Sequence, residues 1–269
     1  MNSGNAPRPK GDGSRLSERD LKILSLVGKL GISLFEIIHT EQFKGLHHDA
    51  VKSTLRRLCG KAPTYRYLRP IPLYGSRVAY QLTYRGAGII GAPSSVARPL
   101  GIQGRVERFA MLRFIYDRTE SKRRLMTNAK LREFYPLAQH RLPRQRFFLE
   151  ERPTGDYLGF VVVDHGGHER RIVRKAVEFL RRFLRHGWFD DDIRAGQFVL
   201  TILTLNDFKS RSIAYGLKKK LRQILGRPLA ALHAPYPGNW PLPVEIVVIP
   251  QLMNLIPGKT ASSLTRRKK

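Results

Sequence analysis

The stretch YLGFVVVDHGGHERRIVRKAVEFLRRFLRHG, residues 157–187, decides the fold of the larger part of the chain. Its first half is an apolar run that ends at Asp164, which predicts a strand buried on both faces. Two glycines follow and predict a turn. Apolar residues then recur at helical spacing, which predicts an amphipathic helix over residues 168–186. A buried strand that leads into such a helix is typical of α/β domains.

Strand-like and helical runs on both sides of this stretch extend the same pattern. The further elements predicted are strands over residues 146–151 and 197–205, a basic helix over residues 210–225 and a last strand over residues 243–253. Strands that alternate with helices favour one sheet covered by helices. We therefore predict an α/β domain with a mixed sheet over residues 142–256.

The N-terminal region has a different pattern. Ser17, followed three residues later by Asp20, is a capping-box signal for a first helix. The later elements predicted here are helices over residues 34–42 and 47–58, then strands over residues 65–73 and 77–84 around a Tyr-Gly-Ser turn. Three helices followed by a β-hairpin are the order of a winged helix-turn-helix, which we predict for residues 16–92.

The remaining segments separate or flank these two domains. Residues 93–141 open with a stretch rich in proline, glycine and serine, and are predicted to form a linker with bridging helices. Residues 1–15 are predicted to be a disordered basic arm, and residues 257–269 a basic tail. The fold class expected for the whole chain is α/β (α+β), with a small DNA-binding domain first and a larger domain second.

The balance of charge is the strongest compositional signal. The chain has 49 Lys plus Arg against 21 Asp plus Glu, a formal net charge of +28. Such an excess is typical of proteins that neutralise phosphates, with a ribosome-associated protein or a membrane-surface binder as alternatives. A single cysteine excludes a disulfide framework and a cysteine-based zinc site, and it favours a cytoplasmic location. No apolar run has the length of a membrane span, so no membrane partner is expected.

The positions of the basic residues also predict which side chains contact DNA. In a winged helix the third helix enters the major groove while the wing contacts the backbone. The residues predicted to contact DNA in this domain are His48, Lys52, Arg56, Arg57, Arg66, Arg69 and Arg77. Those predicted in the second domain are Arg170, Arg171, Arg174, Arg181, Arg182, Lys218, Lys219 and Lys220. A merely solvated basic surface is the alternative for the second set.

Three motifs together resemble the replication-relaxation family, which is similar to the MobC-type relaxases of mobilisable plasmids. They are LSERDLKILSLV at residues 16–27, YQLTYRGAGIIG at residues 80–91, and GFVVVDHGGHERRIVRKAVEFLRRFL followed by FVLTILTLND. The resemblance implies a winged helix joined to a restriction-endonuclease-like domain. It also implies a role at an origin of transfer or replication of a plasmid or mobile element.

The nuclease motif that the resemblance implies is degenerate in this chain. Active members carry Pro-Asp on one strand, two acidic residues on the next, then glycine, and a lysine on the following helix. Here Pro143 is followed by Arg144, and Val162 stands at one acidic position, whereas Asp164 and Lys175 fit. One carboxylate is a poor site for Mg²⁺, which prefers several oxygen ligands. We therefore expect no metal and no cofactor.

The histidines beside Asp164 allow a second interpretation of this segment. His165 and His168 suggest a transition-metal site, but they straddle the predicted turn. The expected role of Asp164 is instead to cap the following helix or to pair with an arginine.

Three functions remain as alternatives. The first is a double-stranded DNA-binding protein that acts as an accessory or recruiting factor without cleavage. The second is a metal-dependent, site-specific DNA-nicking relaxase or endonuclease, with Asp164, Lys175 and Glu150 as catalytic residues and Mg²⁺ or Mn²⁺ as cofactor. The third is a DNA-anchored adaptor or transcriptional regulator that recruits a relaxase or replication protein, with residues 231–250 as its docking surface.

Overall fold

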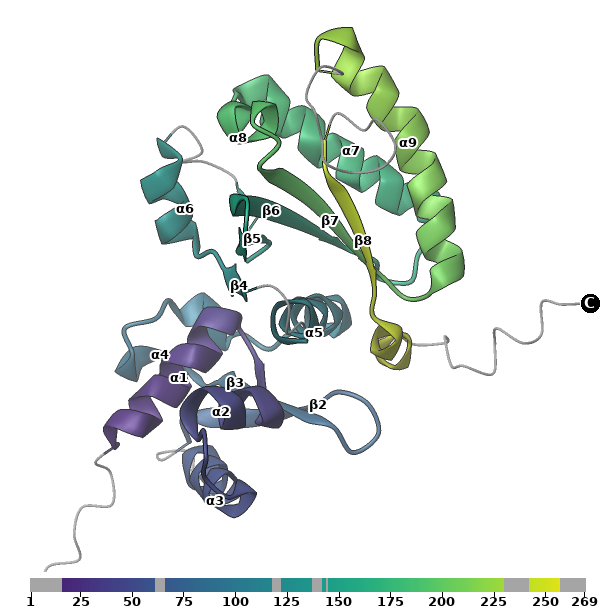
Figure 1. The fold of residues 1–269 in the computed structure, drawn as a ribbon. Coiled ribbons are helices and arrows are strands. Elements are labelled where there is room, and N and C mark those ends of the chain that lie inside the picture. Colours follow the sequence, from purple (N-terminus) through teal and green to yellow (C-terminus); the bar gives the residue numbers. More distant parts are fainter. Residues whose placement is uncertain are drawn as a thin grey trace, which may run out of the picture. The chain divides into compact units, whose positions relative to one another are not determined.

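The computed structural model describes residues 16–60, 66–117, 122–136, 142–143, 145–229 and 242–256. The protein is mixed α/β, with a three-stranded and a five-stranded sheet among these residues (Figure 1). It divides into two compact units. Unit 1 holds the chain up to Arg98 except Leu73–Ser76, which group with unit 2 from Pro99 onward. The predicted arm and tail, residues 1–15 and 257–269, lie outside the described residues.

Unit 1 contains three helices before its hairpin, as predicted. Its elements are α1 (Glu18–Leu30), β1 (Ser33–Leu34), α2 (Phe35–Gln42), α3 (His48–Cys59), β2 (Leu68–Pro72), β3 (Val78–Leu82), α4 (Tyr84–Ile89) and the 3₁₀ helix η2 (Ser94–Ala97). The capping box is confirmed, because Ser17 N donates to Asp20 Oδ2 at 2.8 Å and Asp20 N donates to Ser17 Oγ at 3.2 Å. Reciprocal bonds of this kind satisfy donors that a helix start leaves unpaired.

Apolar seams of the helices form the core of unit 1. Val51, Leu55 and Leu58, which recur at helical spacing along α3, are buried together with residues of α1. Leu21, which shares the apolar spacing of α1, is instead 38% exposed. The predicted hairpin of β2 and β3 is confirmed, and β1 pairs with β3 to give the sheet order β1-β3-β2, all antiparallel.

The segment after the hairpin differs from the prediction. The predicted hairpin ended at residue 84 with no further helix before the linker, but residues 84–89 form the short helix α4. Thr83 caps this helix by accepting a hydrogen bond from Gly86 N at 3.1 Å. Gly86 also lies so close to the backbone just before β2 that a Cβ there would stand 2.2 Å from the carbonyl oxygen of Tyr67. The glycine serves this close backbone approach, which sequence spacing does not reveal.

Replacing Gly86 with alanine should destabilise the protein by about 1–3 kcal/mol, because backbone cannot move aside as a flexible side chain would. Gly88 is the matched control on the same helix, where an added Cβ meets nothing within 4 Å. Its replacement by alanine should be neutral or stabilise by up to about 1 kcal/mol. Urea denaturation of both variants measures the difference, and equal effects would contradict the assigned role of Gly86.

Unit 2 is built on a mixed sheet. Its elements are α5 (Ile102–Tyr116), β4 (Lys122–Leu125), α6 (Asn128–Phe134), β5 (Phe147–Arg152), β6 (Gly155–Val163), α7 (Glu169–His186), α8 (Asp190–Arg194), β7 (Phe198–Thr204), α9 (Asp207–Leu229), β8 (Val244–Val248) and the 3₁₀ helix η4 (Pro250–Leu255). The strand order is β4-β5-β6-β7-β8. Neighbours from β4 to β6 are antiparallel, and those from β6 to β8 are parallel. The predicted mixed sheet is confirmed.

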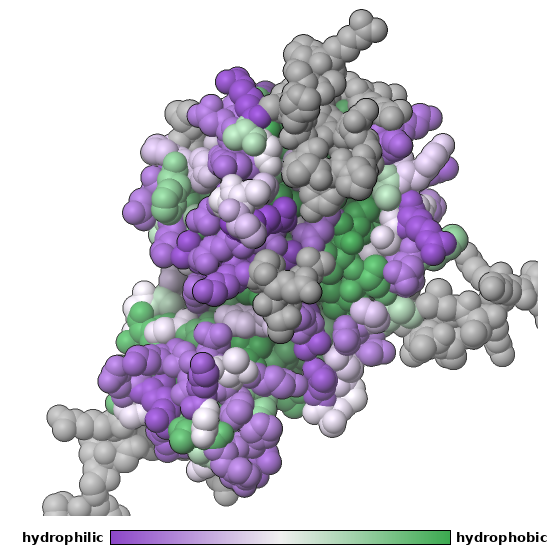
Figure 2. Space-filling model, viewed as in Figure 1, coloured by the Kyte–Doolittle hydropathy of each residue, from purple (hydrophilic) through white to green (hydrophobic). Residues whose placement is uncertain are grey.

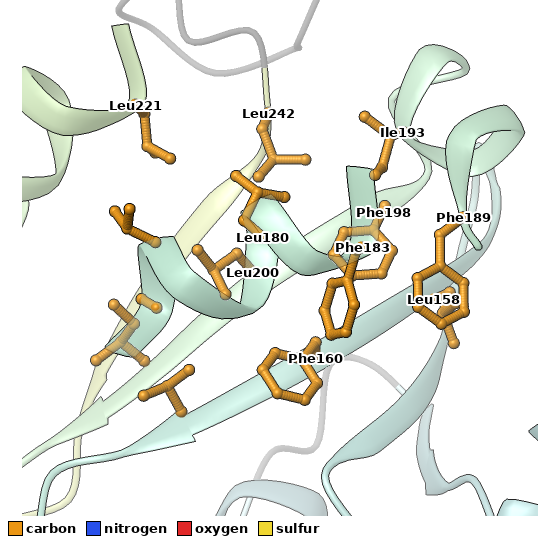
Figure 3. Close-up of a cluster of buried hydrophobic side chains, with 14 of the residues drawn as sticks. Leu158, Phe160, Leu180, Phe183, Phe189, Ile193, Phe198, Leu200, Leu221 and Leu242 are labelled. Atoms are coloured by element: carbon orange, nitrogen blue, oxygen red, sulfur yellow. The ribbon is translucent and has the colours of Figure 1, made fainter. Parts of the chain in front are cut away.

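Helices cover the central strands of this sheet on both sides. Phe160 and Leu200 pack against Leu180 and Phe183 of α7 on one face, and Leu221 of α9 belongs to the same cluster (Figure 3). On the other face, the ring of Phe114 in α5 lies 4.8 Å from that of Phe148. This double cover explains the nearly continuous apolar sequences of β6 and β7.

One strand of the sheet was not predicted. Residues 122–125 (KRRL) form the edge strand β4, in a region expected to be only a linker with helices. Arg123 and Leu125 are the buried residues of this strand. Because one of these two buried positions holds a charged residue, the sequence does not show the alternation of apolar and polar residues that is typical of a strand. Arg123 is buried because it pairs with Glu150 of β5 at 3.1 Å and Glu245 of β8 at 3.0 Å. The arginine thus links both edge strands of the sheet.

Two further expectations concern the end of the chain and the membrane. Residues 231–241 of the expected docking surface lie outside the described residues, whereas residues 244–248 form β8 inside the sheet. Within the described part of the chain, no helix combines the length and the apolar character needed to cross a lipid bilayer.

Candidate phosphate-binding site

The carboxyl end of β6 is where the sequence placed a reactive aspartate. Asp164 directly follows this strand and is fully buried. Its Oδ2 accepts hydrogen bonds from Lys209 Nζ at 2.7 Å and from Thr204 Oγ1 at 3.2 Å. Its Oδ1 accepts one from Gly166 N at 2.8 Å. Both carboxylate oxygens are therefore already bound by the protein.

The two roles expected for Asp164 are wrong. The cap of α7 is His168, whose Nδ1 accepts a hydrogen bond from Arg170 N at 3.2 Å. The charged partner of Asp164 is a lysine rather than an arginine, and it lies near the start of α9. Lys209 also donates to the carbonyl oxygen of Gly167 at 2.6 Å. The pair therefore joins the β6–α7 turn to α9.

A pocket of about 610 Å³ opens beside the β6–α7 turn. Its lining residues come from α5, from Arg146 directly before β5, from the end of β6 and the turn that follows it, and from α7. Its cationic side chains are Arg146, Arg171, Arg174 and Lys175, with His165 beside them, and its carboxylates are Glu107 and Glu178. Positive groups outnumber negative ones, so the pocket favours an anion.

Two nitrogens in this pocket remain without a hydrogen bond. Arg146 donates to Glu107 through Nη2, and its guanidinium lies 5.7 Å from the ring centre of Phe179. Among the described residues, its buried Nη1 has no hydrogen-bond partner, and neither has Nε2 of His165. That histidine nitrogen lies 4.0 Å from Glu107 Oε1. Buried polar groups are nearly always satisfied, so these two suit an oxygen-bearing ligand.

Burial and neighbouring charges shift the pKa values of Lys175 and His165 in this pocket. Burial lowers the pKa of Lys175, the charge of Arg146 lowers it further, and Glu107 opposes both. Burial also lowers the pKa of His165; Glu107 and Asp164 oppose this, while Lys175 and Arg146 add to it. The pocket thus disfavours further positive charge. A bound anion would relieve the repulsion among its cations.

The His165 shift has a consequence for stability. Its pKa in the folded protein lies below the ordinary value near 6.5, so the unfolded chain binds its proton more readily and stability falls as pH decreases through that window. The wild type should therefore lose more free energy of unfolding than His165→Asn between about pH 7.5 and about pH 5.5. Urea denaturation at both pH values measures this, and equal losses would contradict it.

The residues at this end of the sheet do not fit a divalent metal ion. Lys209 closes off Asp164, and Glu107 faces Arg146 and His165. The described segments contain no group of three or more His, Cys, Asp or Glu residues able to hold a metal. Mg²⁺ takes several oxygen ligands, and the cations of this pocket would repel it.

Glu150, the third predicted catalytic residue, lies near the other end of β6. It pairs in register with Tyr157, and the seven residues from there to Asp164 span roughly 23 Å of extended strand. Its carboxylate is bound by Arg123 at 3.1 Å and by Arg152 at 2.7 Å. The structure therefore does not bring Glu150 and Asp164 together.

The arginine found in the pocket is not the one expected. Arg144 lies outside the described residues. Arg146 is two residues further along the chain, directly before β5. Sequence reasoning missed both Arg146 and its partner Glu107. No sequence signal connected Arg146 with a carboxylate 39 residues away.

Most basic residues predicted to contact DNA in unit 2 are accessible. The exposed ones are Arg170, Arg171, Arg174 and Arg181 on α7 and Lys218, Lys219 and Lys220 on α9. Arg182 is half-buried, with its guanidinium 5.5 Å from the ring centre of Trp188. Arg171, Arg174 and Lys175 also line the pocket described above, so the pocket continues into the basic surface of α7.

In unit 1, several of the residues predicted to contact DNA lie on α3. Lys52 and Arg56 are both exposed and lie four residues apart on one side of the helix. Lys52 is 3.3 Å from Asp49 Oδ1. The ring of His48 packs edge-on against His39 at 4.5 Å. Arg57 reaches the buried carboxylate of Asp20 at 2.5 Å while remaining 53% exposed.

The hairpin residues divide into exposed and internal ones. Arg66 is exposed, and Arg77 lies 3.5 Å from Glu36. Arg69 donates to Gln81 Oε1 at 2.8 Å and to the carbonyl oxygen of Ala97 at 2.5 Å. Burial lowers its pKa. The guanidinium of Arg69 therefore stabilises the fold of unit 1, and Arg69 is not suited to the phosphate contact that was predicted for it.

Comparison with known proteins gives no relative for this chain. No protein-family model, no curated protein and no solved structure matches it. The function is therefore inferred from the geometry and charge of the two units.

Proposed function

We propose that this chain binds double-stranded DNA without cleaving it. In this proposal it acts at an origin of transfer or replication, as an accessory factor that recruits a relaxase or replication protein. The observation that carries the proposal is the pocket of Arg146, His165 and Lys175, where Nη1 of Arg146 and Nε2 of His165 have no hydrogen-bond partner among the described residues and suit an anion. The net charge of +28 supports the same partner.

The architecture of unit 1 supports a winged helix that holds the duplex. Its element order runs from α1 through β1, α2 and α3 to the β2–β3 hairpin, and β1 joins the hairpin as a third strand. In such folds the third helix enters the major groove. Lys52 and Arg56 would then face the bases or phosphates, while Arg66 and Arg77 would contact backbone from the hairpin.

The architecture of unit 2 supports a nuclease-like domain that has lost its metal site. The start of β5 and the end of β6 lie side by side, with Val161 N donating to Arg146 O at 2.9 Å. These are the places where the replication-relaxation pattern would put its acids. Arg146 brings a fixed positive charge there, which can bind a phosphate directly in place of a metal ion. Figure 2 shows hydrophilic side chains interspersed with hydrophobic areas over the described residues.

The first test is the salt dependence of duplex binding, measured by fluorescence anisotropy with a labelled duplex. Affinity should fall about 100-fold between about 50 mM and about 200 mM salt, because each phosphate contact releases counterions. Binding that stays flat over this range would refute a phosphate-based interface. A supercoiled-plasmid assay with Mg²⁺ or Mn²⁺ should show no nicking; cleavage that Lys175→Ala abolishes would instead establish an enzyme.

The second test concerns α3. Replacing Lys52 and Arg56 with alanine should weaken binding to a selected site more than binding to random DNA, because base contacts carry the preference. Lys29, exposed near the end of α1, is the matched control. Equal loss on both DNAs would indicate that α3 contributes only general charge.

A further inference from the structure

Helix α9 carries two aromatic side chains that project from the surface of unit 2. Phe208 is 82% exposed and Tyr215 is 77% exposed. They are seven residues apart, which places them on one side of the helix about 10 Å from each other. Aromatic rings usually bury most of their area, so two exposed rings in line indicate a binding surface.

Tyr215 forms part of a groove between α7 and α9. The groove has a volume of about 690 Å³, and its apolar floor includes Val173 and Val177 of α7. Gly216 of α9 lies directly over Val173: a Cβ there would stand 3.1 Å from the valine Cγ2. The absence of a side chain at this position keeps the helices close and leaves the groove open beside the tyrosine ring.

Basic side chains border the groove. The cations along it are Arg170, Arg174 and Arg181 on α7 and Lys219 and Lys220 on α9. Two carboxylates also line it, Glu169 and Glu178, and Glu178 is 3.7 Å from Arg174. The groove therefore combines a net positive border, an apolar floor and the ring of Tyr215, and Phe208 extends this surface along the same side of α9.

We propose that the α7–α9 groove binds single-stranded nucleic acid, with bases stacked on Phe208 and Tyr215 and phosphates against the basic border. Cations attract any nucleic acid, but exposed rings contribute only where bases are unpaired, because a duplex hides the faces of its bases. This inference rests on the proposed function in one respect, that the partner is nucleic acid. It assigns the unpaired strand to the α7–α9 groove and leaves the duplex to α3 and to the pocket of Arg146, His165 and Lys175.

The test compares a labelled oligothymidine of about 15 nucleotides with a labelled duplex of the same length by fluorescence anisotropy. The double variant Phe208→Ala, Tyr215→Ala should bind the oligothymidine about 10- to 100-fold more weakly and the duplex within about twofold of wild type. Tyr215→Trp, which keeps a stacking ring, should retain single-strand affinity. Phe134→Ala is the matched control, since Phe134 is 62% exposed on α6, away from the groove.

The outcomes separate this inference from the proposed function. Unchanged oligothymidine binding by the double variant, or equal losses on both DNAs, would overturn the stacking role while duplex binding stands. Absence of binding to either DNA would overturn both proposals. Displacement of the oligothymidine by an acidic helical peptide at equal affinity would identify the groove as a protein-docking site instead. Photocrosslinking of bromodeoxyuridine-substituted oligonucleotide to Tyr215 would support the stacked geometry directly.

Discussion

Replacing Lys209 with methionine should destabilise the protein by about 3–5 kcal/mol. Asp164 is fully buried, and the lysine is its charged partner at 2.7 Å with a side chain only 11% exposed. Methionine fills a similar volume but leaves the carboxylate in the interior without a cation. The remaining hydrogen bonds from Thr204 and Gly166 offset only part of that cost. Urea denaturation of the variant measures the loss.

Lys218 is the matched control for this prediction, because it is an exposed lysine on the same helix. Lys218→Met should change the free energy of unfolding by less than about 0.5 kcal/mol. Adding Asp164→Asn to Lys209→Met should recover part of the loss, with a coupling of about 1–3 kcal/mol. A Lys209→Met variant as stable as the control would show that the pair does not hold the β6–α7 turn. Asp164→Ala would likewise leave Lys209 without its carboxylate, so a loss of activity in that variant would reflect lost stability rather than lost chemistry.

Replacing Arg123 with methionine should cost about 3–5 kcal/mol as well. The guanidinium is 1% exposed and binds Glu150 and Glu245, while its Cζ lies 4.0 Å from the ring centre of Phe114. Without it, two carboxylates from β5 and β8 face each other with less compensation. The edge strand β4 would also lose its link to β8. Thermal and urea denaturation measure the loss.

Arg124, the next residue on β4, provides the control. Its side chain is 54% exposed, and its nearest carboxylates are 3.7 and 3.8 Å away. Arg124→Met should therefore change stability by less than about 1 kcal/mol. Glu245→Gln added to Arg123→Met should restore part of the loss by removing one uncompensated charge. Equal effects of the two arginine replacements would disprove a central role for the network.

Local sequence signals predicted most elements because they depend on near neighbours. The Ser17–Asp20 box, the seam of Val51, Leu55 and Leu58, and the helix that follows Asp164 all needed only capping chemistry and apolar spacing. Prediction failed where a residue departs from the local pattern because its partners are distant in the sequence. β4 was missed because its buried position holds Arg123, whose partners are 27 and 122 residues away.

By itself, the sequence determined a strongly basic α/β protein, the helices and strands with clear periodicity, and Lys175 and His165 as members of an unusual segment. Only the tertiary structure decided which partners the charged side chains of that segment have. Parallel pairing of β6 with β7 brings Lys209 to Asp164, the residue that the alternative nuclease function would use for catalysis. The packing of α5 brings Glu107 to Arg146, at the pocket that His165 and Lys175 also line. Charges find partners by distance in space, which periodicity along the chain does not encode.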